Sequence, residues 1–271
     1  MNDSKLDKSR TELVASGGML GCAPNGTNYD GSPATAVPVG LGSDGEVMVV
    51  DFFKSPHWLV SGMPGSGKTT FLANTIIPTL ISKNTSDELR LIIIDPQNDT
   101  YPEIRDSQYL LRPIIRSAED CKDTFNWLVD EMERRYEKLV QQRVINVNQY
   151  KQAGHNDMPY ILVIIDNLEQ LGMSKKKIFE DQAIRILQKS KAVGIFMVVA
   201  TRRPRVDVVS GLMKANFATR ISFKHKDQID SRVALDQTGA EKLEKPGNFI
   251  IECVETDLKP VVVRPLSSID L

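Results

Sequence analysis

The stretch GMPGSGKTT, residues 62–70, constrains the fold of this chain more than any other part of its sequence. It follows the apolar run HWLVS, precedes a segment with helical composition, and matches the pattern G-x-x-x-x-G-K-[ST]. Glycines in such a strand–loop–helix unit let the loop close tightly, so that backbone N–H groups and the start of the helix face phosphate oxygens. The pattern therefore predicts a phosphate-binding loop.

The residues of this loop have separate expected roles. Lys68 is expected to reach the β- and γ-phosphates of a nucleotide, and the hydroxyl of Thr69 is expected to bind Mg²⁺. Because the loop contacts only phosphates, it does not identify the base of the nucleotide. The predicted nucleotide-binding residues are Gly62, Met63, Pro64, Gly65, Ser66, Gly67, Lys68, Thr69 and Thr70.

A second apolar run supplies the acidic group that such a site requires. YILVIID ends at Asp166, and we expect this carboxylate to hold the hydration shell of Mg²⁺ beside Thr69, so Asp166 and Lys68 are both catalytic candidates. LIIID, which ends at Asp95, is the competing candidate. Asp166 is favoured because Asp95 comes soon after the helix of the loop and precedes Pro96, which suits a chain that is leaving the sheet.

Short apolar runs alternate with longer helix-like segments from residue 37 onward. Several runs are apolar throughout, which is typical of strands covered by helices on both faces. The alternation predicts an α/β fold with a mainly parallel central sheet flanked by helices. The run IFMVVAT ends at Thr201, where a polar sensor of the γ-phosphate is expected. The predicted strands are 47–50, 58–61, 91–94, 160–165, 195–200, 219–223 and 248–252, and the predicted helices are 68–82, 118–142, 176–193 and 206–215.

Composition limits the possible partners, the cellular compartment and the domain boundaries. The 271-residue chain has a formal net charge of -1, so any nucleic-acid contact must come from a local basic patch. Its three cysteines are too widely spaced for a metal site or a disulfide framework and suit a cytosolic protein. Residues 1–36 are rich in Gly, Asn, Ser, Thr and Pro, which predicts a flexible arm or linker before one domain of residues 37–271. Any membrane anchor is expected only in N-terminal regions of a longer parent protein.

From Val37 to Leu271 the chain resembles the motor domain of the FtsK/SpoIIIE family of hexameric DNA-translocating ATPases. The resemblance implies a RecA-like P-loop fold, ATP as the nucleotide, a homo-hexameric ring with ATP sites between subunits, and sequence-independent passage of double-stranded DNA. The similar stretches are VPVGLGSDGEVMVVDFFKSPHWLVSGMPGSGKT, LIIIDPQ, WLVDEMERRYEKL, MPYILVIID, KAVGIFMVVATRRP, GLMKANFATRISF, DSRVALDQTGAEKL and PGNFI.

Three positions depart from the family pattern. Asn167 stands where family members have a glutamate that positions the attacking water, Arg202 replaces a neutral glutamine, and Gln97 replaces a lysine. An amide can orient water but is not a general base, and loss of one positioned catalytic group costs on the order of 10² to 10⁴ in rate. Glu169 is the alternative base, although a helix start there would aim it elsewhere. Arg202 is expected either to act as an arginine finger in cis or to bind the γ-phosphate.

Other basic residues are candidates for contacts beyond the nucleotide. The resemblance implies that a neighbouring subunit supplies an arginine to the ATP site, and Arg220 and Arg232 are the candidates, with ordinary surface ion pairs as the alternative. Lys214 lies in a stretch that resembles a pore-facing loop, so it is the predicted DNA contact. The triplet Lys175, Lys176 and Lys177 is more simply explained as a solvated helix start.

The sequence thus predicts the motor domain of a cytoplasmic translocase that couples MgATP hydrolysis to the movement of double-stranded DNA. Two alternatives stay open. The first is a regulatory or scaffold module that binds nucleotide with little hydrolysis, which Asn167 and Arg202 motivate. The second is a coupling ATPase of type VII secretion. If turnover is low, the substitution Asn167→Glu is expected to restore it.

Overall fold

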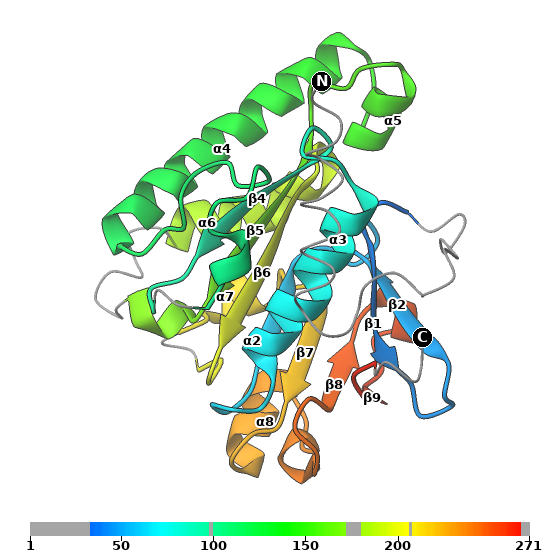
Figure 1. The fold of residues 1–271 in the computed structure, drawn as a ribbon, viewed down its shortest axis with the longest axis vertical. Helices are drawn as coiled ribbons and strands as arrows, with labels where there is room; N and C mark the ends of the chain where they lie inside the picture. Colours follow the sequence, from blue (N-terminus) through cyan, green and yellow to red (C-terminus); the bar gives the residue numbers. More distant parts are fainter. Residues whose placement is uncertain (1–32, 98–99, 172–179, 206–207, 267–271) are drawn as a thin grey trace.

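A mainly parallel sheet forms the centre of the molecule (Figure 1). The computed structural model describes residues 33–97, 100–171, 180–205 and 208–266. The strands of this sheet are β3 (Trp58–Ser61), β4 (Leu89–Ile94), β5 (Tyr160–Asp166), β6 (Ile195–Thr201), β7 (Thr219–Phe223), β8 (Phe249–Glu252) and β9 (Val261–Val263). Across the described residues their order is β4-β5-β6-β3-β7-β8-β9, with β8 and β9 antiparallel to their neighbours and all other pairs parallel. The predicted α/β architecture is confirmed.

The helices connect these strands. The described helices are α2 (Lys68–Phe71), α3 (Ile77–Lys83), α4 (Ala118–Gln141), α5 (Val147–Gln152), α6 (Glu180–Lys189), α7 (Gly211–Lys214) and α8 (Gln228–Leu235). A π-helical segment, η1 (Leu72–Ile76), joins α2 to α3. Short 3₁₀ turns are η2 (Pro102–Ile104), η3 (Leu168–Leu171), η5 (Ser190–Val193), η6 (Ala240–Lys242) and η7 (Val254–Thr256).

The strand order places helices on both faces of the sheet. The connection from β3 to β4 moves along the sheet in one direction, whereas those from β4 to β5 and from β5 to β6 move in the other. Because such crossovers are right-handed, the helix after β3 lies on one face, and α4 and α6 lie on the opposite face. Figure 1 shows α2 and α3 in front of the strands, and α4 packs against α6. The sheet is therefore covered on both sides, as its apolar strands require.

An antiparallel hairpin, β1 (Ala36–Leu41) and β2 (Val47–Asp51), packs against η1 and α3. Strand β1 was not predicted, because Pro38 and Gly40 argue against a strand; the hairpin accommodates them at a register shift between these two residues. The run from Val47 pairs with β1 and not with the central sheet. Since β1 begins at Ala36, the folded domain includes the last residue of the segment predicted as an arm.

Three helix predictions need correction. The helix predicted for 68–82 continues to Lys83 and contains the π-helical segment. Of the helix predicted for 176–193, the described part is α6 followed by a 3₁₀ turn, and the lysine triplet at 175–177 lies outside the described residues. The helix predicted for 206–215 begins only at Gly211, because the hydroxyl of Ser210 caps it by accepting a hydrogen bond from the N–H of Met213 at 3.3 Å.

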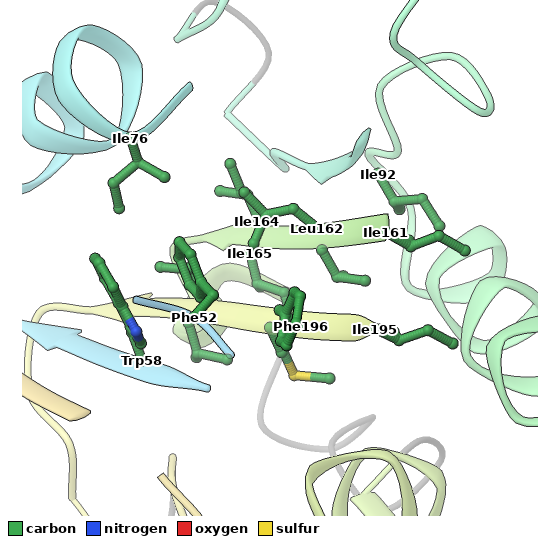
Figure 2. Close-up of a cluster of buried hydrophobic side chains, with 14 of the residues drawn as sticks. Phe52, Trp58, Ile76, Ile92, Ile161, Leu162, Ile164, Ile165, Ile195 and Phe196 are labelled. Carbon is green, nitrogen blue, oxygen red and sulfur yellow. The ribbon is translucent and has the colours of Figure 1, made fainter. Parts of the chain in front are cut away.

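The core lies on both faces of the sheet, against the helix that follows β3 on one face and against α4 and α6 on the other. Every residue of β5 and β6 is buried, which explains their uninterrupted apolar sequence. Figure 2 shows Phe52 between Trp58 and Phe196; its ring centroid lies 4.1 Å from that of Trp58 and 5.8 Å from that of Phe196. This packing holds the N-terminal end of β3, and with it the position of the loop that follows the strand. No helix among the described residues is long and apolar enough to cross a bilayer.

Candidate nucleotide-binding site

The loop between β3 and α2 has the backbone conformation that its glycines predict. Gly62 and Gly67 have φ angles of 150° and 109°. A Cβ atom at Gly62 would lie 2.7 Å from Cβ of Phe223, and one at Gly67 would lie 3.1 Å from Cα of Gly247. Only glycine fits both the conformation and the space. The N–H of Met63 donates to the carbonyl oxygen of Lys224 at 2.8 Å, which ties the loop to the chain beyond β7.

Lys68 is the first residue of α2, and its ammonium group lies over the loop. Its Nζ donates to the carbonyl oxygens of Gly62 at 2.6 Å and Met63 at 3.0 Å. Burial lowers the pKa of Lys68 to about 8, although the carboxylates of Asp166 and Glu169 act to raise it. A cation held at low dielectric at the start of a helix suits a polyphosphate anion.

Asp166 ends β5 and faces the same loop. Its Oδ2 accepts hydrogen bonds from the hydroxyl of Thr69 at 2.9 Å and from the hydroxyl of Tyr101 at 3.0 Å. Burial raises the pKa of Asp166, while these two hydrogen bonds act in the opposite direction. Thr69 and Asp166, the two predicted magnesium ligands, are thus in direct contact. Tyr101 had no signal in the sequence, because its role depends on a contact with a residue 65 positions away in the chain.

Asp95, the competing acidic candidate, directly follows β4, which is separated from β3 by β5 and β6. Its carboxylate accepts from the backbone N–H groups of Gln97 at 3.0 Å and Thr100 at 3.2 Å. Asp95 therefore stabilises the turn that leaves its own strand. Gln97, by contrast, lies on the wall of the cavity described below.

The end of β6 lies beside the end of β3, since Thr201 pairs with Ser61. The 3₁₀ turn after β5 approaches it from the other side, and the hydroxyl of Thr201 donates to Oε1 of Glu169 at 2.8 Å. Asn167, between the strand and this turn, has a φ angle of 89°. Asparagine tolerates positive φ better than glutamate does, because its short amide can bond locally.

A cavity of about 570 Å³ opens at these strand ends. Its wall combines loop residues such as Lys68 and Thr69 with Asp166, Asn167 and Arg202. The hydroxyl oxygen of Ser66 in the same loop is buried and has no hydrogen-bond partner among the described residues, but Ser66 does not line the cavity. The cavity wall also includes residues to which sequence reasoning assigned no role: Phe71, Asn74, Thr75, Phe223, Pro246, Gly247, Pro265 and Leu266.

The other predicted basic residues lie outside this cavity. Lys214 Nζ donates to the carbonyl oxygen of Val233 at 2.6 Å and pairs with Asp236 at 2.7 Å, and Arg220 pairs with Asp236 at 2.5 Å. Arg232 is exposed and forms no ion pair within the part of the chain that the structure describes. Lys214, Arg232 and Asp236 line a second cavity of about 410 Å³ beside α7 and α8.

The parallel sheet, the glycine loop and the Thr69–Asp166 pair define a P-loop nucleotide-binding domain. Residues 28–206 match the model of the FtsK/SpoIIIE family, and the chain belongs to this family. It is 40% identical over 224 residues to the DNA translocase SftA of Bacillus subtilis, covering 81% of this chain and 23% of SftA. It is 38% identical over 221 residues to the DNA translocase FtsK of Mycobacterium tuberculosis, covering 76% of this chain and 26% of that protein.

The chain therefore spans about a quarter of the length of these relatives. Among solved structures, it is similar to the pCW3 conjugation coupling protein TcpA, with a TM-score of 0.76 and 23% identity over 92% of this chain and 70% of that one. It is also similar to the cytoplasmic domain of the type VII secretion ATPase EccC of Thermomonospora curvata, with a TM-score of 0.74 and 21% identity over 94% and 30%. These two similarities show a shared fold.

Proposed function

We propose that this chain is the motor domain of a cytoplasmic translocase that binds MgATP at the P-loop and uses its hydrolysis to move double-stranded DNA through a ring of identical subunits. The observation that carries the proposal is the convergence of Lys68, Thr69 and Asp166 on one cavity. Family membership and the relatives named DNA translocases support DNA as the cargo. The sequence prediction of an N-terminal arm before the motor domain stays part of this proposal, although Ala36, predicted in the arm of 1–36, belongs to β1.

The residues of the cavity fit a nucleotide and a magnesium ion. Backbone N–H groups at the end of the loop and the start of α2, together with the ammonium of Lys68, would hold the phosphates. The hydroxyl of Thr69 and the carboxylate of Asp166 are oxygen donors of the kind that Mg²⁺ prefers, and few protein ligands suffice because this ion keeps several waters. Bound Mg²⁺ would neutralise negative charge on the reacting phosphates.

Hydrolysis in this site would rely on orientation and electrostatics. Asn167 can hold a water molecule by its amide but cannot accept its proton. An arginine from a neighbouring subunit would stabilise the charge that develops on the phosphoryl group. Arg232 is the stronger candidate for this role, because it is exposed and unpaired among the described residues, whereas Arg220 is held by Asp236. Lys214 remains the candidate for the DNA backbone, although a phosphate would have to compete with Asp236 for it.

The test is steady-state ATP hydrolysis with and without long duplex DNA, using Lys68→Ala as the blank. We expect DNA to raise turnover well above the blank. Tight ATP binding with turnover at the level of the blank at every DNA concentration would contradict the motor and favour a nucleotide-binding regulatory module. That second function is supported by one observation, the positive φ at Asn167, which disfavours the glutamate of the family pattern at this position. The similarity to EccC concerns the fold alone, so it does not favour protein as the cargo.

A further inference from the structure

The carboxylate of Glu169 is held by residues at the end of β6 and by Asn167. Oε1 accepts from the hydroxyl of Thr201 and from the N–H of Arg203, both at 2.8 Å, and Oε2 accepts from the N–H of Arg202 at 3.2 Å. The amide of Asn167, oriented to satisfy its own partners, adds a fourth donor to Oε2 at 2.8 Å. Four donors match the four lone-pair sites of a carboxylate. Glu169 therefore has no acceptor site left for a water molecule, which argues against the alternative that it serves as the base.

Glu169 and Asn167 hold the backbone and the side chain of Arg202. Glu169 accepts from its backbone N–H, and the amide oxygen of Asn167 accepts from its Nε at 3.1 Å. The positive φ of Asn167 turns the chain so that its amide lies between the carboxylate and the guanidinium. A glutamate at this position would place a second carboxylate against Glu169.

Arg203, the residue after Arg202, does not share this arrangement. Arg203 extends to α8, where its Nε pairs with Asp230 at 3.0 Å, and it does not line the nucleotide cavity. Arg202 lines that cavity together with Lys68, Thr69 and Asp166. Two cations, Lys68 and Arg202, thus converge on a cavity whose oxygen ligands gather around Asp166. A planar guanidinium suits the terminal phosphate of a nucleotide, because it can donate two parallel hydrogen bonds to it.

We propose that Glu169 and Asn167 are positioning residues that hold Arg202 in the cavity, where its guanidinium binds the terminal phosphate and makes the site selective for nucleoside triphosphates over diphosphates. The inference rests on the proposed nucleotide binding at the P-loop, but on neither hydrolysis nor DNA. The inference explains together the two departures from the family pattern at Asn167 and Arg202. The amide of Asn167 cannot act as a base, but it can support the guanidinium of Arg202 from the same subunit.

The test measures the affinities of fluorescent ATPγS and fluorescent ADP for the full chain with Mg²⁺. Arg202→Ala is expected to weaken ATPγS on the order of tenfold to a hundredfold, as loss of hydrogen bonds between charged groups implies, and to change ADP less than about twofold. Glu169→Ala should also lower the affinity for ATPγS relative to that for ADP. Glu169→Gln, which keeps the shape of the side chain, should lower this affinity ratio less. In the double variant Glu169→Ala/Arg202→Ala the two effects should not add. Arg203→Ala is the matched control and should leave the ratio unchanged.

The outcomes distinguish the role proposed for Arg202 from the proposed function of the chain. An unchanged ATPγS-to-ADP ratio in Arg202→Ala contradicts this inference and leaves the nucleotide site intact. Equal weakening of both nucleotides in Glu169→Ala and Glu169→Gln shows that Glu169 supports the loop structure only, which also contradicts it. A wild-type chain that binds neither nucleotide contradicts the proposed function itself.

Discussion

The hydroxyl of Tyr101 donates a hydrogen bond to Oδ2 of Asp166, the atom that also accepts from Thr69. Tyr101 lies directly before η2 and is almost completely buried. When Thr69 turns its oxygen toward a metal ion, Tyr101 is the donor that keeps the carboxylate in place. The loop after β4 thus supports the carboxylate that we propose to hold Mg²⁺.

Tyr101→Phe should therefore affect both stability and the Mg²⁺ requirement. Removing the hydroxyl leaves the buried Asp166 with one donor, which should lower the free energy of unfolding by about 1 to 3 kcal/mol and raise the Mg²⁺ concentration needed for tight ATPγS binding. Urea unfolding and a Mg²⁺ titration of nucleotide affinity measure the two effects. Tyr109→Phe is the control, because Tyr109 is also buried and donates to the carbonyl oxygen of Asn84 at 2.9 Å. If both variants have the wild-type Mg²⁺ dependence, Tyr101 does not orient Asp166.

Asn167→Glu is no longer expected to restore hydrolysis on its own. A glutamate at a φ of 89° is strained, and it would face the carboxylate of Glu169, so we expect a loss of about 1 to 3 kcal/mol in stability and no gain in turnover. Asn167→Gly separates the two causes, since glycine accepts the backbone angle but removes the amide. It should stay close to wild-type stability while losing selectivity for ATPγS over ADP. A DNA-stimulated rise in turnover for Asn167→Glu would show that the turn can adapt to a catalytic glutamate.

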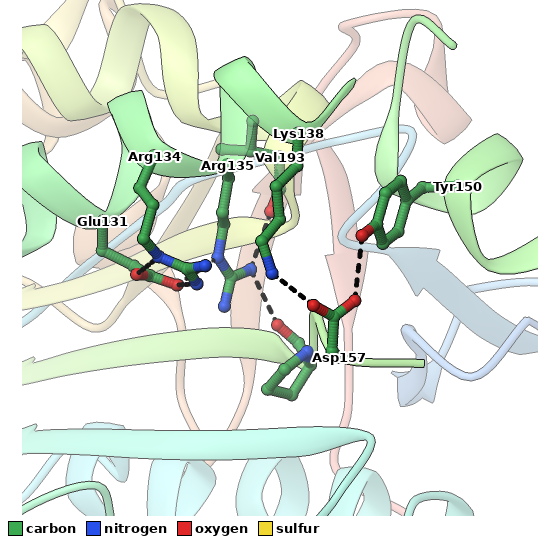
Figure 3. A network of polar contacts seen from close by, with 8 residues as sticks. Glu131, Arg134, Arg135, Lys138, Tyr150, Asp157 and Val193 are labelled. Carbon is green, nitrogen blue, oxygen red and sulfur yellow. Dashed lines mark hydrogen bonds and ion pairs between the residues drawn. The ribbon is translucent and has the colours of Figure 1, made fainter. Parts of the chain in front are cut away.

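Two adjacent arginines on α4 should differ sharply in their effect on stability. Figure 3 shows that Arg134 and Arg135 both contact Glu131, but only Arg135 is buried, and its Nη1 also donates to the carbonyl oxygens of Pro159 at 2.7 Å and Val193 at 2.8 Å. Arg135→Met leaves these acceptors without a donor and should cost about 3 to 5 kcal/mol. Arg134→Met removes an exposed ion pair and should cost less than about 1 kcal/mol. Urea unfolding of the two variants provides the comparison, and equal losses would contradict the role given to Arg135.

Stability should fall on mild acidification because of His57. Its Nδ1 accepts from the N–H of Met197 at 3.2 Å, so the folded protein holds the neutral ring, and burial lowers the pKa of His57 to about 3. The unfolded chain binds this proton near pH 6.5. The stabilising effect is therefore complete above pH 6.5 and is lost progressively as pH falls toward 3, with about 2 kcal/mol lost between pH 7 and pH 5.

His57→Asn should remove that part of the pH dependence. Asparagine does not titrate and tolerates the positive φ of 56° at this position. The free energy of unfolding should still depend on pH to some extent, because burial also lowers the pKa of His225, to about 4. The free energy of unfolding at pH 7 and pH 5, compared between wild type and variant, is the measurement. The same acid sensitivity in both proteins would show that His57 is not the titrating group.

Much of the fold and the phosphate loop follows from local sequence. The loop needs glycine at particular backbone angles, and the parallel strands need uninterrupted apolar residues, so both leave contiguous patterns. Strand β1 left no such pattern, because it contains Pro38 and Gly40. The register shift between them accommodates the proline, and Gly40 is needed because a Cβ atom there would clash with the carbonyl oxygen of Arg264. Helix α7 was predicted too long for a similar reason: the capping bond of Ser210, and not the apolar spacing, determines where it begins.

The sequence by itself determined that a phosphate-binding loop lies between a buried strand and a helix, and that Asp166 ends another buried strand. Tertiary structure alone decided how the site is completed. Tyr101 reaches Asp166, and Glu169 and Asn167 reach Arg202, through hydrogen bonds between chain segments that the strand order brings to one edge of the sheet. Such bonds depend on distances between atoms and on one unusual backbone angle, and neither quantity is visible in the identity of the residues.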